Sequence, residues 1–323
     1  MNTAGKLSAY GVALALVAGG AWAIGSAVGP LGEKTAAPAK DAGHGDAHSG
    51  TVVETGQAAE ALPAGLASSR GGYTLTPTST TLTAGPNTFS FRVTGPDGEP
   101  VTRFDVEHEK RMHLIVVRRD TAGFQHVHPE MSADGTWSVP LTLPQPGSYR
   151  AFADFAPTGG EATTLGVDLA VPGDFQPTDY APSRVSTVDG YDVRLDGDLV
   201  PGKTAELTLT VRKDGKPVTD LQPYLGAYGH LVALRGGDLA YLHVHPDGEP
   251  GDGATKPGPT VTFYAEVPSA GAYRLFLDFQ HGNTVRTAEF TIATDGHALP
   301  QPAPAPAESG GHADDGAAGH GHN

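Results

Sequence analysis

Two short stretches of this chain occur twice, and their repetition determines its architecture. Residues 112–118 read MHLIVVR and recur as GHLVALR at residues 229–235, an offset of 117. Residues 124–129, FQHVHP, recur at the same offset as YLHVHP, residues 241–246. Because both stretches keep one offset without a gap between them, the chain contains an internal duplication, and each copy is expected to form one domain.

The duplication extends to both sides of these stretches. DGEPVT at residues 97–102 recurs as DGKPVT at residues 214–219, again at an offset of 117. GSYRAFADF at residues 147–155 recurs as GAYRLFLDF at residues 271–279, where the offset has risen to 124. The difference, 124 minus 117, places seven additional residues in the second copy. We expect them in the Gly- and Pro-rich segment 247–259, because surface loops tolerate changes of length.

The residue pattern of each copy predicts β-structure. Short apolar runs alternate with Asp-Gly turns, and 44 Gly with 27 Pro favour many strands over long helices. Residues 114–117 are apolar on both faces of a strand and belong in the middle of a packed sheet, whereas residues 149–155 present two different faces. The sequence therefore predicts an all-β protein with two tandem immunoglobulin-like or cupredoxin-like β-sandwich domains, following an N-terminal hydrophobic helix.

The composition also predicts the boundaries along the chain. Residues 7–32 carry no charge and follow a single basic side chain, Lys6, which is typical of an export signal. This run of 26 residues is long enough to span a bilayer of about 30 Å and is interpreted as an uncleaved membrane anchor with extracytoplasmic domains; the alternative is secretion after cleavage near Ala23. We predict a signal anchor or signal peptide at 1–32, a disordered linker at 33–70, β-sandwiches at 71–173 and 189–294 joined by a linker at 174–188, and a disordered tail at 295–323.

Charge and cysteine content exclude several classes of function. The formal net charge is −15 and only 21 Lys and Arg are present, so a nucleic-acid partner is not expected. The absence of cysteine excludes disulfides, iron–sulfur ligation, thiol catalysis and a blue-copper site. Any metal ion would have to be bound by histidine, carboxylate or methionine.

The histidines of the duplicated stretches form the candidate site. His126 and His128 lie two residues apart and project from one face of a strand, while His113 precedes His126 by thirteen residues, a separation suited to an antiparallel hairpin. Three imidazoles with an open coordination position suit Cu(II) or Zn(II). The sequence thus predicts one metal site per repeat, with these ligands: His113, His126 and His128 in the first, and His230, His243 and His245 in the second.

Other polar residues accompany this set of histidines. Asp154 and Asp278 occupy equivalent positions and can act as a fourth ligand or, as we favour, hold an imidazole N–H. His108 and His281 have no counterpart in the other repeat and are interpreted as surface residues. The histidines outside the domains form either a weak metal reservoir or a solubilising tail; they are His44, His48, His312, His320 and His322.

Two resemblances bear on this interpretation. The Asp-Gly-x-Pro-Val turn at 97–101, followed by the apolar strand beginning at His113, resembles the extracytoplasmic β-sandwich modules of YtkA-like and CopC-like copper-handling proteins. It covers part of each copy, and the Met-rich or amino-terminal His ligands of those families are absent here. The His-Val-His-Pro and Tyr-Arg-x-Phe-x-Asp-Phe patterns are closer to secreted actinobacterial tandem β-sandwich proteins of uncharacterised activity. The first resemblance implies copper handling; the second implies no activity.

The sequence therefore predicts a non-enzymatic extracytoplasmic protein that binds copper or zinc in one histidine site per repeat, in metal homeostasis. The alternative is a cell-surface structural or protein-interaction module without metal. An enzyme is not predicted, because no nucleophile with a base and no phosphate loop is found. Glu130 and Asp247 correspond to each other, each directly after a His-Pro, and are a weak candidate for a hydrolytic base, because a carboxylate at such a position is more often a solvated turn residue.

Overall fold

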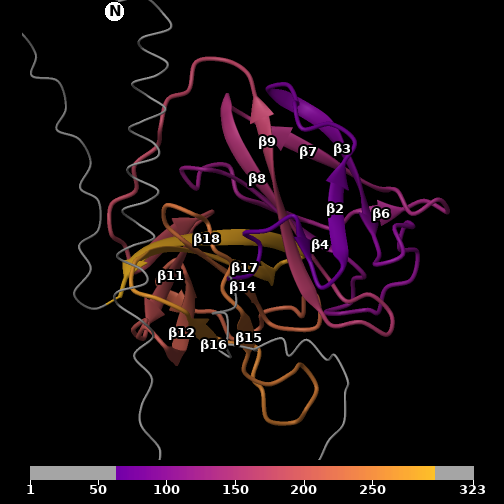
Figure 1. Ribbon diagram of the computed structural model, residues 1–323. Coiled ribbons are helices and arrows are strands. Elements are labelled where there is room, and N and C mark those ends of the chain that lie inside the picture. The colour runs from indigo at the N-terminus through magenta and orange to yellow at the C-terminus, as the bar shows by residue number, and fades with distance from the viewer. Residues whose placement is uncertain (1–62, 295–323) are drawn as a thin grey trace, which may run out of the picture. The chain divides into compact units, whose positions relative to one another are not determined.

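The computed structural model describes residues 63–294 (Figure 1). The predicted N-terminal helix, most of the first linker and the C-terminal tail lie outside these residues. Every element of the described part is a β-strand, and it contains no apolar helix of membrane-spanning length. The prediction of an all-β fold with two tandem sandwiches is confirmed.

The strands of the first repeat form two sheets, which are drawn in indigo to magenta in Figure 1. One sheet has the order β1-β2-β3-β7-β6 and the other the order β5-β4-β8-β9. The bounds are β1 Ser69–Arg70, β2 Tyr73–Pro77, β3 Gly85–Thr94, β4 His113–Arg118, β5 Gln125–Val127, β6 Glu130–Met131, β7 Trp137–Leu143, β8 Gly147–Phe155 and β9 Thr163–Val171.

The second repeat repeats this plan with one change. Its larger sheet has the order β10-β11-β12-β16-β15, with β13 paired to β12, and its smaller sheet has only β14-β17-β18. The bounds are β10 Val185–Val188, β11 Tyr191–Asp196, β12 Lys203–Lys213, β13 Lys216–Pro217, β14 His230–Arg235, β15 Val244–Pro246, β16 Thr260–Val267, β17 Ala272–His281 and β18 Thr284–Ala293. Both sandwiches begin slightly before the predicted boundaries, because β1 and β10 pair with the strands that follow them.

Alternation along the strands accounts for both cores. In β3 the side chains of Phe89, Phe91 and Val93 are buried while the residues between them are partly or fully exposed, as expected for a sheet with one buried face. β12 follows the same pattern. At the start of the equivalent strands β8 and β17, Tyr149 and Tyr273 donate their hydroxyls to backbone carbonyls four residues upstream, each at 2.7 Å. This is the tyrosine corner of immunoglobulin-like sandwiches.

The loop that carries the seven extra residues lies where the sequence placed it. β15 ends at Pro246 and β16 begins at Thr260, so the connection is segment 247–259. In the first repeat β6 ends at Met131 and β7 begins at Trp137. The insertion therefore lengthens a connection between two strands of one sheet and leaves the core strands unchanged.

A third apolar cluster joins the two repeats, and its members are related by the duplication. Leu114 and Val116 of β4 face the core of their own sandwich, whereas Ile115 and Val117 belong to the joining cluster. The other members of this cluster are Phe124, Phe152, Val232, Leu234, Leu239, Tyr241 and Phe276. Strand 114–117 is thus apolar on both faces because one face packs within its domain and the other packs against the second repeat.

The contacts in this joining cluster are reciprocal. The ring of Phe124 stacks on that of Phe276 with centroids 4.0 Å apart, and the equivalent pair, Tyr241 and Phe152, lies at 5.7 Å. Phe124 corresponds to Tyr241 and Phe152 to Phe276, so each repeat offers the same surface to the other. An interface of this kind is isologous, as in a twofold symmetric dimer.

Candidate metal centre

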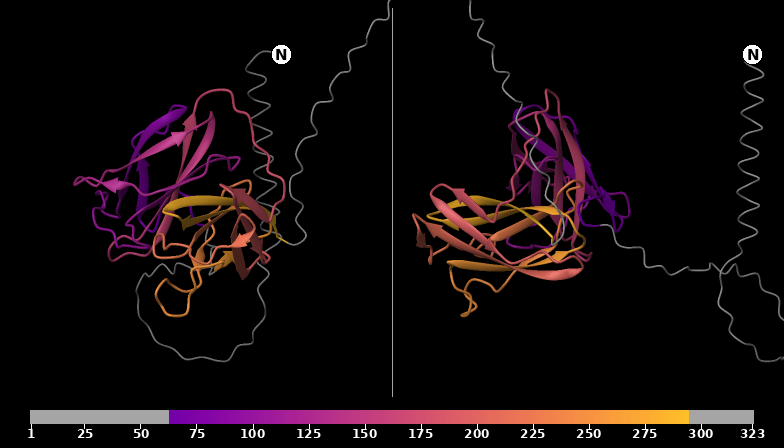
Figure 2. Two further views of the ribbon diagram at one scale, coloured as in Figure 1. Left: turned by 180° about the vertical axis from the view of Figure 1, so that it is seen from behind. Right: turned by 90° about the vertical axis from the view of Figure 1, so that its left-hand side faces the viewer.

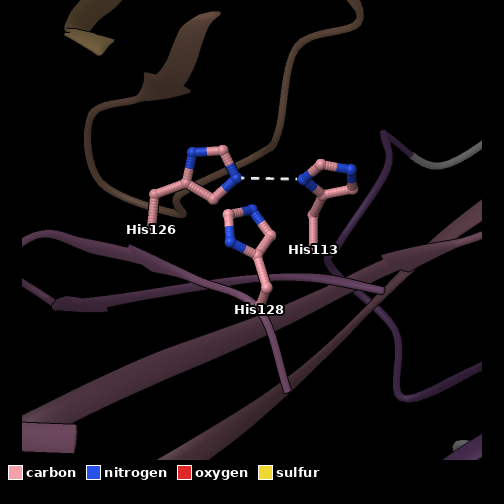
Figure 3. Close-up of side chains that lie close together, drawn as sticks. All are labelled: His113, His126 and His128. Carbon is pink, nitrogen blue, oxygen red and sulfur yellow. Dashed lines mark hydrogen bonds between the residues drawn. The ribbon is translucent and has the colours of Figure 1, made fainter. Parts of the chain in front are cut away.

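The predicted hairpin brings the three histidines of the first repeat together. β5 pairs antiparallel with β4, with Ile115 opposite His126 and Leu114 opposite Val127. His113 begins β4 and His128 follows β5, so all three imidazoles lie on the face that carries Ile115. Their ring centroids are 5.0 to 5.4 Å apart, and one nitrogen of each ring lies within 4.8 Å of the others (Figure 3).

The nitrogens of His113 and His126 that point away from the cluster have hydrogen-bond acceptors. His113 Nε2 lies 3.0 Å from the carbonyl oxygen of Glu107, and His126 Nδ1 lies 2.8 Å from Oδ2 of Asp278. Because a carbonyl and a carboxylate can only accept, we assign the protons to these two nitrogens. His113 Nδ1 and His126 Nε2 are then both left with lone pairs.

These two unprotonated nitrogens face each other at 3.1 Å, the contact marked by the dashed line in Figure 3. Two lone pairs at this distance repel each other unless a cation lies between them, either a shared proton or a metal ion. In addition, His128 Nε2 is buried and has no hydrogen-bond partner within residues 63–294. The donor set therefore fits a metal ion bound by three imidazoles.

Burial keeps two of the three rings, those of His113 and His128, neutral. Burial lowers the pKa of His113 to about 4, although its hydrogen bond to Glu107 acts in the opposite direction. Burial, followed by the charge of neighbouring His126, lowers the pKa of His128 to about 3. Neutral imidazole is the form that binds a metal ion, so these two ligands need not lose a proton at neutral pH.

The two aspartates have different partners. Asp278 is 3% exposed; its Oδ1 accepts from the Thr287 hydroxyl at 2.6 Å while its Oδ2 accepts from His126. Asp154 accepts from Thr164 at 2.7 Å, but no imidazole of the described residues donates to it, and burial raises its pKa. Asp278 thus holds an imidazole N–H, as the sequence analysis favoured for these carboxylates, but the histidine belongs to the other repeat.

The histidines of the second repeat are not gathered in the same way. Only the start of the equivalent segment pairs with β14: Tyr241 forms a bridge with Leu234, and the Leu242 N–H donates to the Ala233 carbonyl. β15 then pairs with β16 of the larger sheet, with His245 opposite Tyr264, as β6 pairs with β7 in the first repeat. His243 and His245 are exposed, with ring centroids 4.0 Å apart, while His230 lies apart from them. Within the described part of the chain, the first repeat holds the one group of three metal-ligating side chains, and the predicted second site stays a prediction.

His230 lies instead beside the histidines of the first repeat. Its Nε2 contacts the carbonyl oxygens of Tyr224 and Leu225 at 2.9 and 3.0 Å, as His113 contacts that of Glu107. Its ring centroid is 6.4 Å from that of His126 and 5.3 Å from that of His108. Burial lowers the pKa of His230 to about 4.

His108 is a residue that the sequence analysis did not place near the site. It is exposed, as predicted, but its ring lies 6.2 Å from that of His113 as well as beside His230. It occupies a tight turn with a positive φ of 46°. The repeat comparison could not reveal it, because Leu225 stands at the equivalent position.

A cavity of about 1120 Å³ adjoins these residues and is lined by both repeats. Five of the candidate histidines and one candidate aspartate contribute to its wall: His113, His126, His230, His243, His245 and Asp154. Glu130 and Asp247 do not line this cavity, and both are exposed at strand ends. The site therefore opens onto space large enough for solvent or a small ligand.

The fold and the repeated strands define this chain as a tandem pair of immunoglobulin-like β-sandwiches. It belongs to the family described as "Domain of unknown function (DUF8832)", whose model matches residues 67–173 and again residues 186–296. No curated protein matches the chain in sequence. The resemblance to copper-handling modules is not supported by these comparisons.

Solved structures are similar to this chain at low sequence identity. A bacterial integrin-binding protein, invasin, is 12% identical over 68% of this chain and 39% of its own, with a TM-score of 0.20. A putative membrane-anchored protein from Corynebacterium diphtheriae is 11% identical over 72% of this chain and 60% of its own, with a TM-score of 0.22. The tandem immunoglobulin repeats of Dlar are 10% identical over 69% and 95%, with a TM-score of 0.19. The chain thus spans less than two thirds of the first two structures.

Proposed function

We propose that this chain is an extracytoplasmic β-sandwich protein that binds one divalent transition-metal ion, Cu(II) or Zn(II), in its first repeat. The observation that supports the proposal is the pair of facing, unprotonated nitrogens of His113 and His126 at 3.1 Å, with the unpartnered Nε2 of His128 buried beside them. The charge-free segment 7–32 supports an extracytoplasmic location.

The three imidazoles would hold the ion, whose positive charge would offset the repulsion between the facing lone pairs of His113 and His126. Borderline ions such as Cu(II) and Zn(II) prefer imidazole nitrogen, and three protein ligands leave a position open. The chain's own residues orient the rings: the carbonyl of Glu107 fixes His113, and the carboxylate of Asp278 fixes His126. The proposed role is therefore binding of the ion.

The test is metal titration of a fragment spanning residues 63–294, which retains every described strand and lacks the terminal histidines. We expect one tightly bound ion per chain. The triple variant His113→Ala, His126→Ala, His128→Ala should lose at least about 100-fold in affinity, because all three ligands are removed. The matched triple variant His230→Ala, His243→Ala, His245→Ala should keep the ion.

The outcomes separate the alternatives. Two ions per chain, one removed by each triple variant, would support one site in each repeat. No stoichiometric ion, with a melting temperature unaffected by EDTA, would contradict the proposal.

The second candidate is a surface structural or interaction module that needs no metal. An integrin-binding protein and a tandem of immunoglobulin repeats are among the structures to which this chain is similar. In this case a proton shared between His113 and His126 would relieve the repulsion of their lone pairs. The same titration, with no ion bound, would support this candidate.

A further inference from the structure

We propose that Asp278, a residue of the second repeat, positions His126 for metal binding in the first repeat, so that metal binding and the pairing of the two repeats stabilise each other. This inference rests on the proposed function. The second repeat would thus contribute a positioning residue to a site whose three metal ligands all belong to the first repeat.

The contact between the two side chains is short and buried. Asp278 Oδ2 lies 2.8 Å from His126 Nδ1, and each side chain is 5% exposed. The carboxylate cannot turn away easily, because its other oxygen accepts from the Thr287 hydroxyl at 2.6 Å. It is thus fixed from its own repeat and directed at an imidazole of the other.

This contact determines which nitrogen of His126 is available. A carboxylate that accepts from Nδ1 keeps the proton there and leaves the Nε2 lone pair directed at His113. Such a partner also makes the imidazole a stronger donor to a metal ion, and loss of partners of this kind typically weakens metal binding by about 10- to 100-fold.

The equivalent aspartate of the first repeat lacks this contact. Asp154 corresponds to Asp278 and is held in the same way by a threonine, Thr164 at 2.7 Å. No imidazole of residues 63–294 donates to it, and it is not a member of the three-histidine group. Asp154→Asn therefore removes the equivalent, partly buried carboxylate and leaves in place the contact that sets the tautomer of His126, which makes it a control for the loss of charge.

The coupling follows from linkage. If the carboxylate strengthens metal binding only while the repeats are paired, then the bound ion must stabilise the paired arrangement by the same factor. The joining cluster formed by Phe124, Phe276 and their equivalents holds Asp278 within reach of His126. A metal ion in the first repeat would thus act as a clamp between the two domains.

The experiment measures Zn(II) affinity of the full chain by competition with a chelator, for the wild type, Asp278→Asn and Asp154→Asn. All three share the same tails, so differences between them report the folded domains. We expect Asp278→Asn to bind about 10- to 100-fold more weakly and Asp154→Asn to stay within about threefold of the wild type. The rise in melting temperature on adding Zn(II) should shrink in Asp278→Asn alone.

The proton position of His126 gives a second measurement that needs no variant. In the metal-free chain, ¹⁵N NMR should show His126 protonated at Nδ1. Equal Zn(II) affinities for the two variants would overturn the inference while leaving the proposed function intact. Protonation at Nε2 alone would overturn the inference and would also remove the facing lone pairs of His113 and His126 on which the proposed function rests. Failure of the wild type to bind Zn(II) or Cu(II) would instead overturn the proposed function.

Discussion

The two repeats carry the same three histidines at the same spacing, yet the first gathers them and the second does not. In the first repeat β5 pairs with β4, which brings His126 and His128 beside His113. In the second repeat the segment equivalent to β5 contacts β14 only through Tyr241 and Leu242, and the chain then pairs as β15 with β16, in the place that β6 takes beside β7. The two copies of one ligand pattern therefore differ in whether they form a site because the second chain segment leaves the smaller sheet before its His-Val-His stretch, whereas the first leaves it after Val127.

The apolar part of the interface between the repeats is, by contrast, alike on both sides. Ile115, Val117 and Phe152 of the first repeat have Val232, Leu234 and Phe276 as their equivalents, and all six belong to the joining cluster. The two repeats thus share the surface on which they pair, while the arrangement of the histidines beside it differs.

The largest loss is expected from the apolar part. Phe276→Ala and Phe152→Ala each remove a ring that is fully buried between the repeats, and each should lower the free energy of unfolding by about 3–5 kcal/mol. The measurement is urea unfolding of the two variants side by side. A loss near 4 kcal/mol for one and below about 1 kcal/mol for the other would show that the interface is not symmetric in energy.

An intermediate effect is expected from pH on the metal-free chain. Burial lowers the pKa of His113 to about 4, of His128 to about 3 and of His230 to about 4, all below the ordinary value of 6.5. The unfolded chain then binds more protons than the folded one below pH 6.5, so this stability is complete above pH 6.5 and is lost as the pH falls through about 4.

The urea concentration at the midpoint of unfolding, measured in EDTA, should therefore fall as the pH is lowered from about 7.5 to about 4. The measurements are spaced around the ordinary pKa of histidine, about 6.5. The triple variant of His113, His126 and His128 should flatten this dependence, whereas His243→Ala with His245→Ala should retain most of it because these two rings are exposed. An equal flattening by both variants would contradict the difference between the repeats.

The smallest effect is expected at the outer edge of the smaller sheets. Gly166 lies opposite Phe152, and a Cβ added to it would lie 2.0 Å from the carbonyl oxygen of Gly65, so Gly166→Ala should cost about 1–3 kcal/mol. Glu289 stands at the equivalent place opposite Phe276 and pairs with Arg274. Arg274 is buried but keeps its hydrogen bonds to Thr291 and to the Phe290 carbonyl, and Glu289 is half-exposed, so Glu289→Ala should cost about 1 kcal/mol.

Urea unfolding compares these two variants, and limited proteolysis follows the segment at residues 63–67. Cleavage there should become faster in Gly166→Ala, since Gly65 hydrogen-bonds Thr164 and Gly166 hydrogen-bonds Ala67 in the wild type. Unchanged cleavage would mean that the segment accommodates the added methyl group by a small shift.

Much of the fold could be predicted from the sequence, because its signals are local or repeated. The offset of 117 located both domains, and alternation in strands such as β3 predicted their buried faces. The hairpin joining His113 to His126 followed from their separation and is confirmed by the pairing of β4 with β5.

The remaining features depend on contacts that sequence spacing does not encode. Asp278 lies 152 residues from His126, and only the packing of one domain on the other brings them together. The pairing of β15 with β16 could not be foreseen either, because His-Val-His-Pro is identical in both repeats. Strand 114–117 was correctly expected to be buried on both faces, but its second partner is the other domain and not a covering layer of its own.

The reciprocal joining surface has a consequence for how such a chain can change over time. In a symmetric dimer of separate chains, every substitution appears in both subunits at once, so a binding site is kept or lost in both together. Joining the two halves in one polypeptide makes their association independent of concentration and allows each half to vary alone. One half can then hold the three histidines while the other contributes Asp278. Two identical subunits cannot have such an asymmetric arrangement, because each would carry the same residues in the same places.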